Sequence, residues 1–143
     1  MAKNIRIRPH HLLCIPRFYG GGYSNGFGLN LKKICLAIRN NSDIKIKIVR
    51  ECDDICDKCP YKKENICKKT PKLNKWILRQ DDAVLNKLKI KQDSIYTAKN
   101  IFNKSIDEVT SDNIAEICKG CVFLRNCIKV GINNSFRKDL NKN

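Results

Sequence analysis

Two cysteine triads constrain this chain more than any other feature of its sequence. Each triad is a C-x-x-C pair followed by a third cysteine: Cys56, Cys59 and Cys67, then Cys118, Cys121 and Cys127. Two-residue spacing lets both thiolates of a pair reach one centre from a tight turn, as in zinc knuckles and iron–sulfur loops. We therefore expect the chain to fold around bound metal.

A disulfide framework explains these cysteines less well. The chain has nine cysteines in 143 residues, an odd number that cannot be fully paired within one chain. No segment has the apolar length of a membrane helix, and the first residues do not open the apolar region of a signal peptide. We expect a cytoplasmic protein with no membrane partner, whose thiols are metal ligands or reactive groups.

Cys14 is a candidate further ligand because the only two histidines, His10 and His11, precede it. Residues three and four positions apart share a helical face, so both imidazoles would project near this thiol. Two four-coordinate sites need eight donors, of which the triads supply six, Cys14 a seventh and one imidazole an eighth. A single site built from one triad and Cys14 is equally allowed. The alternative is that both histidines only make hydrogen bonds to backbone groups and bind no metal.

The last two cysteines are not expected to bind metal. Cys35 shares the apolar face of a predicted helix with Ile34 and Ile38, where a buried, inert thiol is the default. Cys52 precedes two aspartates outside both triads, and we interpret it as incidental.

The spacing favours an iron–sulfur cluster, in its 4Fe–4S form, over zinc. Structural zinc sites usually assemble two short pairs around one ion, whereas the third ligand of each triad stands alone here. Pro60 after Cys59 matches the Cys-Pro of bacterial ferredoxin loops. The cluster would transfer electrons or offer an open iron to a substrate, with His10 or His11 moving protons. The alternative is zinc, in a zinc-stapled interaction or nucleic-acid-binding module without catalysis.

The net charge of +15 raises the question of a nucleic-acid partner. Lysines outnumber arginines 21 to 8 and are scattered, whereas phosphate and base recognition favour arginine. The joint enrichment in lysine, asparagine and isoleucine is also what codon usage in an AT-rich genome produces. These patterns argue against nucleic acid and leave a redox partner protein or a small-molecule substrate.

Hydrophobic periodicity predicts a small, mostly helical α+β domain that spans residues 1–143. Two short strands, at 5–8 and 44–49, are expected to pair in a minimal two-stranded sheet. Cysteine-rich metal-binding loops and a glycine-rich loop at 20–28 connect the elements, and a polar tail from about residue 132 is expected to fray. The predicted helices are 10–19, disturbed by Pro16, then 29–38, 70–88, 97–103 and 111–118.

Three segments carry a resemblance to a known family: residues 8–14 (R-P-H-H-L-L-C), residues 53–60 around the first C-x-x-C, and residues 117–127. They resemble the domain of unknown function 1284 family of short bacterial and archaeal proteins, which are suspected of binding iron–sulfur clusters. The resemblance covers nearly the whole chain. It implies that Cys14, both triads and the two histidines belong to the family pattern, and that Cys35 and Cys52 do not. It implies no reaction.

Overall fold

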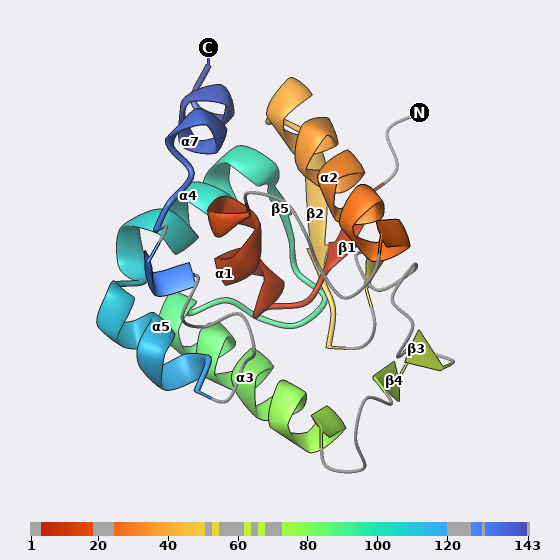
Figure 1. Ribbon diagram of the computed structural model, residues 1–143, viewed down its shortest axis with the longest axis vertical. Coiled ribbons are helices and arrows are strands. Elements are labelled where there is room, and N and C mark those ends of the chain that lie inside the picture. The colour runs from red at the N-terminus through yellow and green to blue at the C-terminus, as the bar shows by residue number, and fades with distance from the viewer. Residues whose placement is uncertain are drawn as a thin grey trace.

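The computed structural model describes residues 4–18, 25–50, 53–54, 62–63, 66–67, 73–119, 127–129 and 131–142. These residues form a mostly helical α+β fold, as predicted (Figure 1). The strands are β1 (Ile5–Ile7), β2 (Lys45–Ile48), β3 (Lys62–Lys63), β4 (Ile66–Cys67) and β5 (Ile95–Thr97). The helices are α1 (His11–Cys14), the 3₁₀ turn η1 (Ile15–Arg17), α2 (Asn25–Asn40), α3 (Leu73–Leu88), α4 (Ala98–Glu108), α5 (Ser111–Ile117) and α7 (Asn134–Leu140).

The main sheet has three strands in the order β1-β2-β5. The predicted pairing of β1 with β2 is confirmed, and the two strands run parallel with Ile5 opposite Ile46. The prediction of a two-stranded sheet is wrong, because β5 adds an antiparallel strand beside β2. Ile-Tyr-Thr makes a strand only three residues long directly before a helix, so it shows no alternation that a sequence pattern could detect. A separate short hairpin joins β3 to β4.

The core lies between the sheet and the helices that cover it. Ile46 and Ile48 on β2 are fully buried, whereas Lys45 at the start of the same strand is exposed. In Figure 1, α2 lies on one side of the sheet, and α1, α3, α4 and α5 group on the other. This placement puts the short α1 among longer helices.

α1 and η1 together fulfil the prediction of a helical segment disturbed by proline. The four-residue α1 passes into a 3₁₀ turn with Pro16 in its first positions, where a missing N–H costs nothing. Leu12 and Leu13 are buried, and the Ser105 hydroxyl of α4 donates to the Leu12 carbonyl at 2.8 Å. The segment is therefore held by two buried leucines and by a hydrogen bond from α4.

The chain after residue 132 is ordered into α7, so the expectation of a frayed tail is wrong. Phe136 and Leu140 lie four positions apart and are both buried against the core. Asn133 caps the helix by accepting from the Phe136 amide, and Asp139 accepts from Arg39 on α2 at 2.7 Å. Two apolar side chains at helical spacing are enough to dock a segment whose composition is otherwise polar.

The other differences concern where elements begin and end. α2 begins at Asn25, so part of the segment predicted as a glycine-rich loop is helical, and α4 extends five residues beyond its predicted end at Asn103. Thr97 caps α4 by accepting from the Asn100 amide. Within the described ranges, no helix combines the length and apolar character needed to cross a bilayer.

Candidate functional site

Two histidine–aspartate pairs lie at the corner where β1 passes into α1. His10 Nδ1 lies 2.7 Å from Asp81 Oδ1 on α3, and His11 Nδ1 lies 2.6 Å from Asp53 Oδ2 after β2. Both carboxylates are fully buried, while the histidine side chains are 13% and 14% exposed. Each imidazole is thus fixed by a buried carboxylate and keeps a small fraction of its surface exposed to solvent.

Arg8 joins the two pairs. Its buried guanidinium donates to Asp81 Oδ2 through Nε at 3.0 Å and forms an ion pair through Nη2 at 2.9 Å. Its backbone N–H donates to Asp53 Oδ2 at 2.7 Å. Burial alone would raise the pKa of Asp81, but the hydrogen bond and charge of His10 and the charge of Arg8 outweigh it and lower that pKa. Asp81 is therefore an ionised carboxylate that binds both neighbours.

His10 is neutral at neutral pH. Burial is the main cause that lowers its pKa, followed by the neighbouring His11, and both outweigh the hydrogen bond to Asp81. Because Nδ1 faces a carboxylate in both histidines, we assign the proton to Nδ1 and the lone pair to Nε2. The ring centroids are 4.3 Å apart with 54° between the planes. The two pairs therefore present two neighbouring imidazoles.

These shifts predict that the protein loses stability in acid. Since the folded-state pKa of His10 lies below its ordinary value of 6.5, the unfolded chain takes up a proton first as the pH falls. The pKa of Asp81 also lies below its ordinary value of 3.8, so it acts in the same direction at lower pH. We expect the free energy of unfolding, measured by urea denaturation, to fall steadily below about pH 6.5. A His10→Gln variant should lose the upper part of this dependence, and an unchanged profile would contradict the assignment.

Arg17 is a buried cation whose pKa is affected by three cysteines, called here the cysteine cluster. Its guanidinium is buried and donates to the Leu13 carbonyl at 2.8 Å. Burial lowers the pKa of Arg17, and the opposing interactions come from the thiols of Cys127, Cys14 and Cys118. No carboxylate pairs with Arg17 among the described residues. Cys14 and two members of the second triad therefore all act on the charge of one buried cation.

Different elements bring these cysteines to Arg17. Cys14 ends α1, one helical turn before Arg17, and Cys118 caps the end of α5. The Gly131 amide donates to the Cys127 carbonyl at 3.0 Å. Gly131 has a φ of 65°, a backbone conformation that favours glycine.

Side chains of α3 hold the end of α5 where Cys118 lies. Gln80 donates to the Ile117 carbonyl at 3.2 Å, and Trp76 donates to the Lys119 carbonyl at 3.1 Å. Because Gln80 is next to Asp81, one turn of α3 contacts both His10 and the residue before Cys118.

The remaining predicted ligands are only partly covered by the structure. Cys56, Cys59 and Cys121 lie outside the described residues, as does Cys52, and of Cys67 only the backbone in β4 is described. No three histidine, cysteine, aspartate or glutamate side chains converge on a possible metal position in the described part of the chain. The ligand set therefore stays a prediction.

Cys35 lies on the buried face of α2, as its sequence position indicated. Burial is the main cause that raises the pKa of this thiol to about 12. It is therefore protonated at neutral pH and a poor metal ligand.

The carboxylates behind the histidines were not predicted from the sequence. Asp53 directly follows Cys52, and Asp81 lies within the predicted amphipathic helix 70–88, so neither position indicates a histidine partner. A signal was present in α3, because Asp81 lies four residues after Ile77 and three before Val84, on the apolar face. A charged residue on that face needs a buried partner, which here is Arg8.

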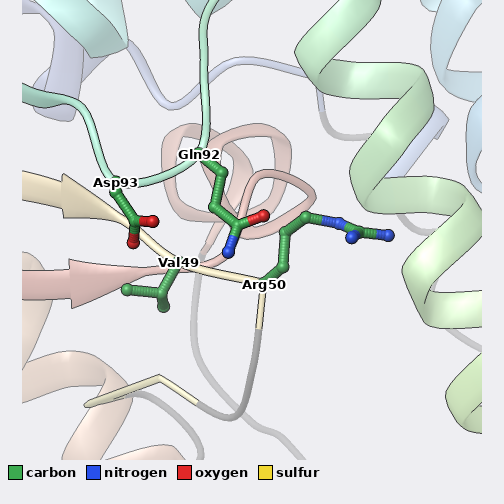
Figure 2. Close-up of a pocket in the computed structure, with 4 residues that line it drawn as sticks. All are labelled: Val49, Arg50, Gln92 and Asp93. Carbon is green, nitrogen blue, oxygen red and sulfur yellow. The ribbon is translucent and has the colours of Figure 1, made fainter.

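A separate cavity of about 310 Å³ lies near the end of β2. Val49, Arg50, Gln92 and Asp93 line it, and Figure 2 shows the Arg50 side chain pointing away from Asp93 toward α3. There Arg50 Nη2 pairs with Asp82 Oδ1 at 3.0 Å. Among the described residues, no histidine or cysteine lines this cavity.

The family model described as "Protein of unknown function (DUF1284)" matches residues 22–127, which is more than half of the chain. The chain belongs to this family. The match confirms the resemblance seen in the sequence. The DUF1284 match includes both triads and begins after Cys14, so the histidine corner lies outside it. Neither the curated proteins nor the solved structures gave a match.

Proposed function

We propose that this DUF1284 protein binds an iron–sulfur cluster through Cys14 and the second triad. The supporting observation is the buried guanidinium of Arg17, whose pKa is raised by the charges of three cysteines against the larger effect of burial. Burying a lone cation costs several kcal/mol even after the protein relaxes. Thiolates that ligate a cluster would supply the compensating negative charge, whereas neutral thiols would not.

In this proposal Cys14, Cys118 and Cys127 ligate iron, and the sequence supplies Cys121 as the fourth ligand. Arg17 stabilises the thiolate form of its neighbours and raises the reduction potential of the cluster by opposing its negative charge. The histidines are not needed for four-coordinate ligation at this centre.

The first triad, Cys56, Cys59 and Cys67, would hold a second centre. Its three cysteines would leave one coordination position without a cysteine ligand. Such a position binds a small-molecule substrate, while the cysteine-complete centre exchanges electrons with a partner protein. A reducing, cytoplasmic location fits free thiols, and Cys14, Cys35, Cys118 and Cys127 form no disulfide.

The colour of the protein tests this proposal. Protein made and purified without oxygen should be brown, with charge-transfer absorption in the blue that dithionite bleaches. A colourless protein with tightly bound zinc would instead favour a structural zinc site at the same cysteines.

A further inference from the structure

We propose that His10 and His11 bind one divalent transition-metal ion through their Nε2 atoms, at a site separate from the cysteine centre. The ion belongs to the borderline class that imidazole prefers: zinc, cobalt, nickel or ferrous iron. The site does not depend on the proposed iron–sulfur cluster.

The carboxylates that contact Nδ1 of both rings are the first observation that supports this site. Metal-binding histidines almost always donate their other ring N–H to a carboxylate, a backbone carbonyl or water, which fixes the tautomer and makes the ligand more basic. Here both histidines do so, at 2.7 Å and 2.6 Å, to carboxylates that are fully buried. Histidines that merely satisfy backbone groups need no such partners, and burying a carboxylate for each is costly.

The distance between the two rings is the second observation that supports this site. An ion about 2.1 Å from each Nε2 lies roughly 3 Å from each ring centre. Ring centres 4.3 Å apart match two ligands in neighbouring positions of one coordination sphere. Both histidine side chains are partly exposed, by 13% and 14%, so an ion can reach the pair from solvent.

The local charge favours a cation. A metal ion binds the neutral form of an imidazole, so the formal charges beside the site are those of Asp53, Asp81 and Arg8, which sum to −1. A divalent ion at Nε2 adds positive charge on the side of the rings that faces away from both carboxylates.

Water or substrate oxygens are the ligands that we expect at the remaining coordination positions. Across the described residues, no third histidine, cysteine, aspartate or glutamate joins the pair. The Cys14 thiol points to the His10 carbonyl at 3.5 Å, on the backbone side of the corner. Water or a substrate oxygen would therefore complete the sphere, as in catalytic metal sites.

Histidine-selective ¹⁵N NMR of the iron-free, full-length protein during addition of zinc chloride tests the site. The chain has only two histidines, so every ring signal is assigned to this corner, whatever zinc does at the cysteines. We expect both Nε2 signals to shift and saturate while both Nδ1 atoms keep their protons. Nε2 signals that stay unchanged in excess zinc would overturn the proposal without bearing on the cluster.

Neighbouring aspartates provide a matched control. Asp53→Asn removes the carboxylate behind His11 and should weaken zinc binding by about 10–100-fold. Asp54→Asn, whose carboxylate binds Arg6 instead, should leave the affinity unchanged. Circular dichroism checks the fold, and His11→Gln replaces Asp53→Asn if that variant does not fold. Equal affinity in the folded test variant and in Asp54→Asn would overturn the proposal.

Discussion

Asp81→Ala is expected to lower the free energy of unfolding by about 3–5 kcal/mol, because it leaves Arg8 buried without its carboxylate. Asp81 accepts two contacts from the Arg8 guanidinium and two from His10, through the backbone amide and Nδ1. Arg8 cannot turn to water instead, since it is itself buried. The loss would be seen as a lower midpoint in urea at pH 7.

Asp82→Ala is the matched control on the next residue of α3. Asp82 is 54% exposed and pairs with Arg50, so the same truncation should cost less than about 1 kcal/mol. If the two variants were equally stable, the buried network around Arg8 would contribute little, and its role in fixing His10 would have to be abandoned.

Cys118→Ser is expected to abolish metal binding at the second triad, whereas Cys35→Ser should leave it intact. The two thiols are matched in burial, with Cys118 8% and Cys35 7% exposed. They differ in surroundings, because Cys118 faces the charge of Arg17 and Cys35 has a pKa of about 12. Since metal binding contributes to folding, Cys118→Ser should also unfold more easily.

Metal content and urea stability of the two variants separate these roles. Cys35→Ser should cost only about 1–3 kcal/mol, as expected when a buried thiol becomes a hydroxyl. Loss of metal from Cys35→Ser, or full retention in Cys118→Ser, would show that the cysteines have been divided wrongly between ligands and core.

The parts of the fold that repeat a pattern were predictable from the sequence. Apolar spacing in α2 and α3 and alternation in β2 identified these elements and the pairing of β1 with β2. β5 and α7 were missed because a strand of three residues and a helix with two buried side chains carry too little periodicity to distinguish them from loop.

The candidate site was less predictable, because its contacts join residues far apart in the chain. Spacing placed Cys14 near the two histidines but could not connect it to Cys118 and Cys127, more than 100 residues away. Nor could it select Asp53 and Asp81 from fourteen acidic residues as the partners of His11 and His10. Buried partners are fixed by the packing of α3 and β2 around the corner, which sequence periodicity does not specify.

Iron and acid-labile sulfide, counted per chain in protein purified without oxygen, test the central claim most directly. The proposal predicts iron and sulfide in near-equal amounts, about four of each for every 4Fe–4S cluster. The second triad with Cys14 would account for one such cluster. Stoichiometric zinc with no sulfide would contradict the account and leave the cysteines around Arg17 as a structural zinc site.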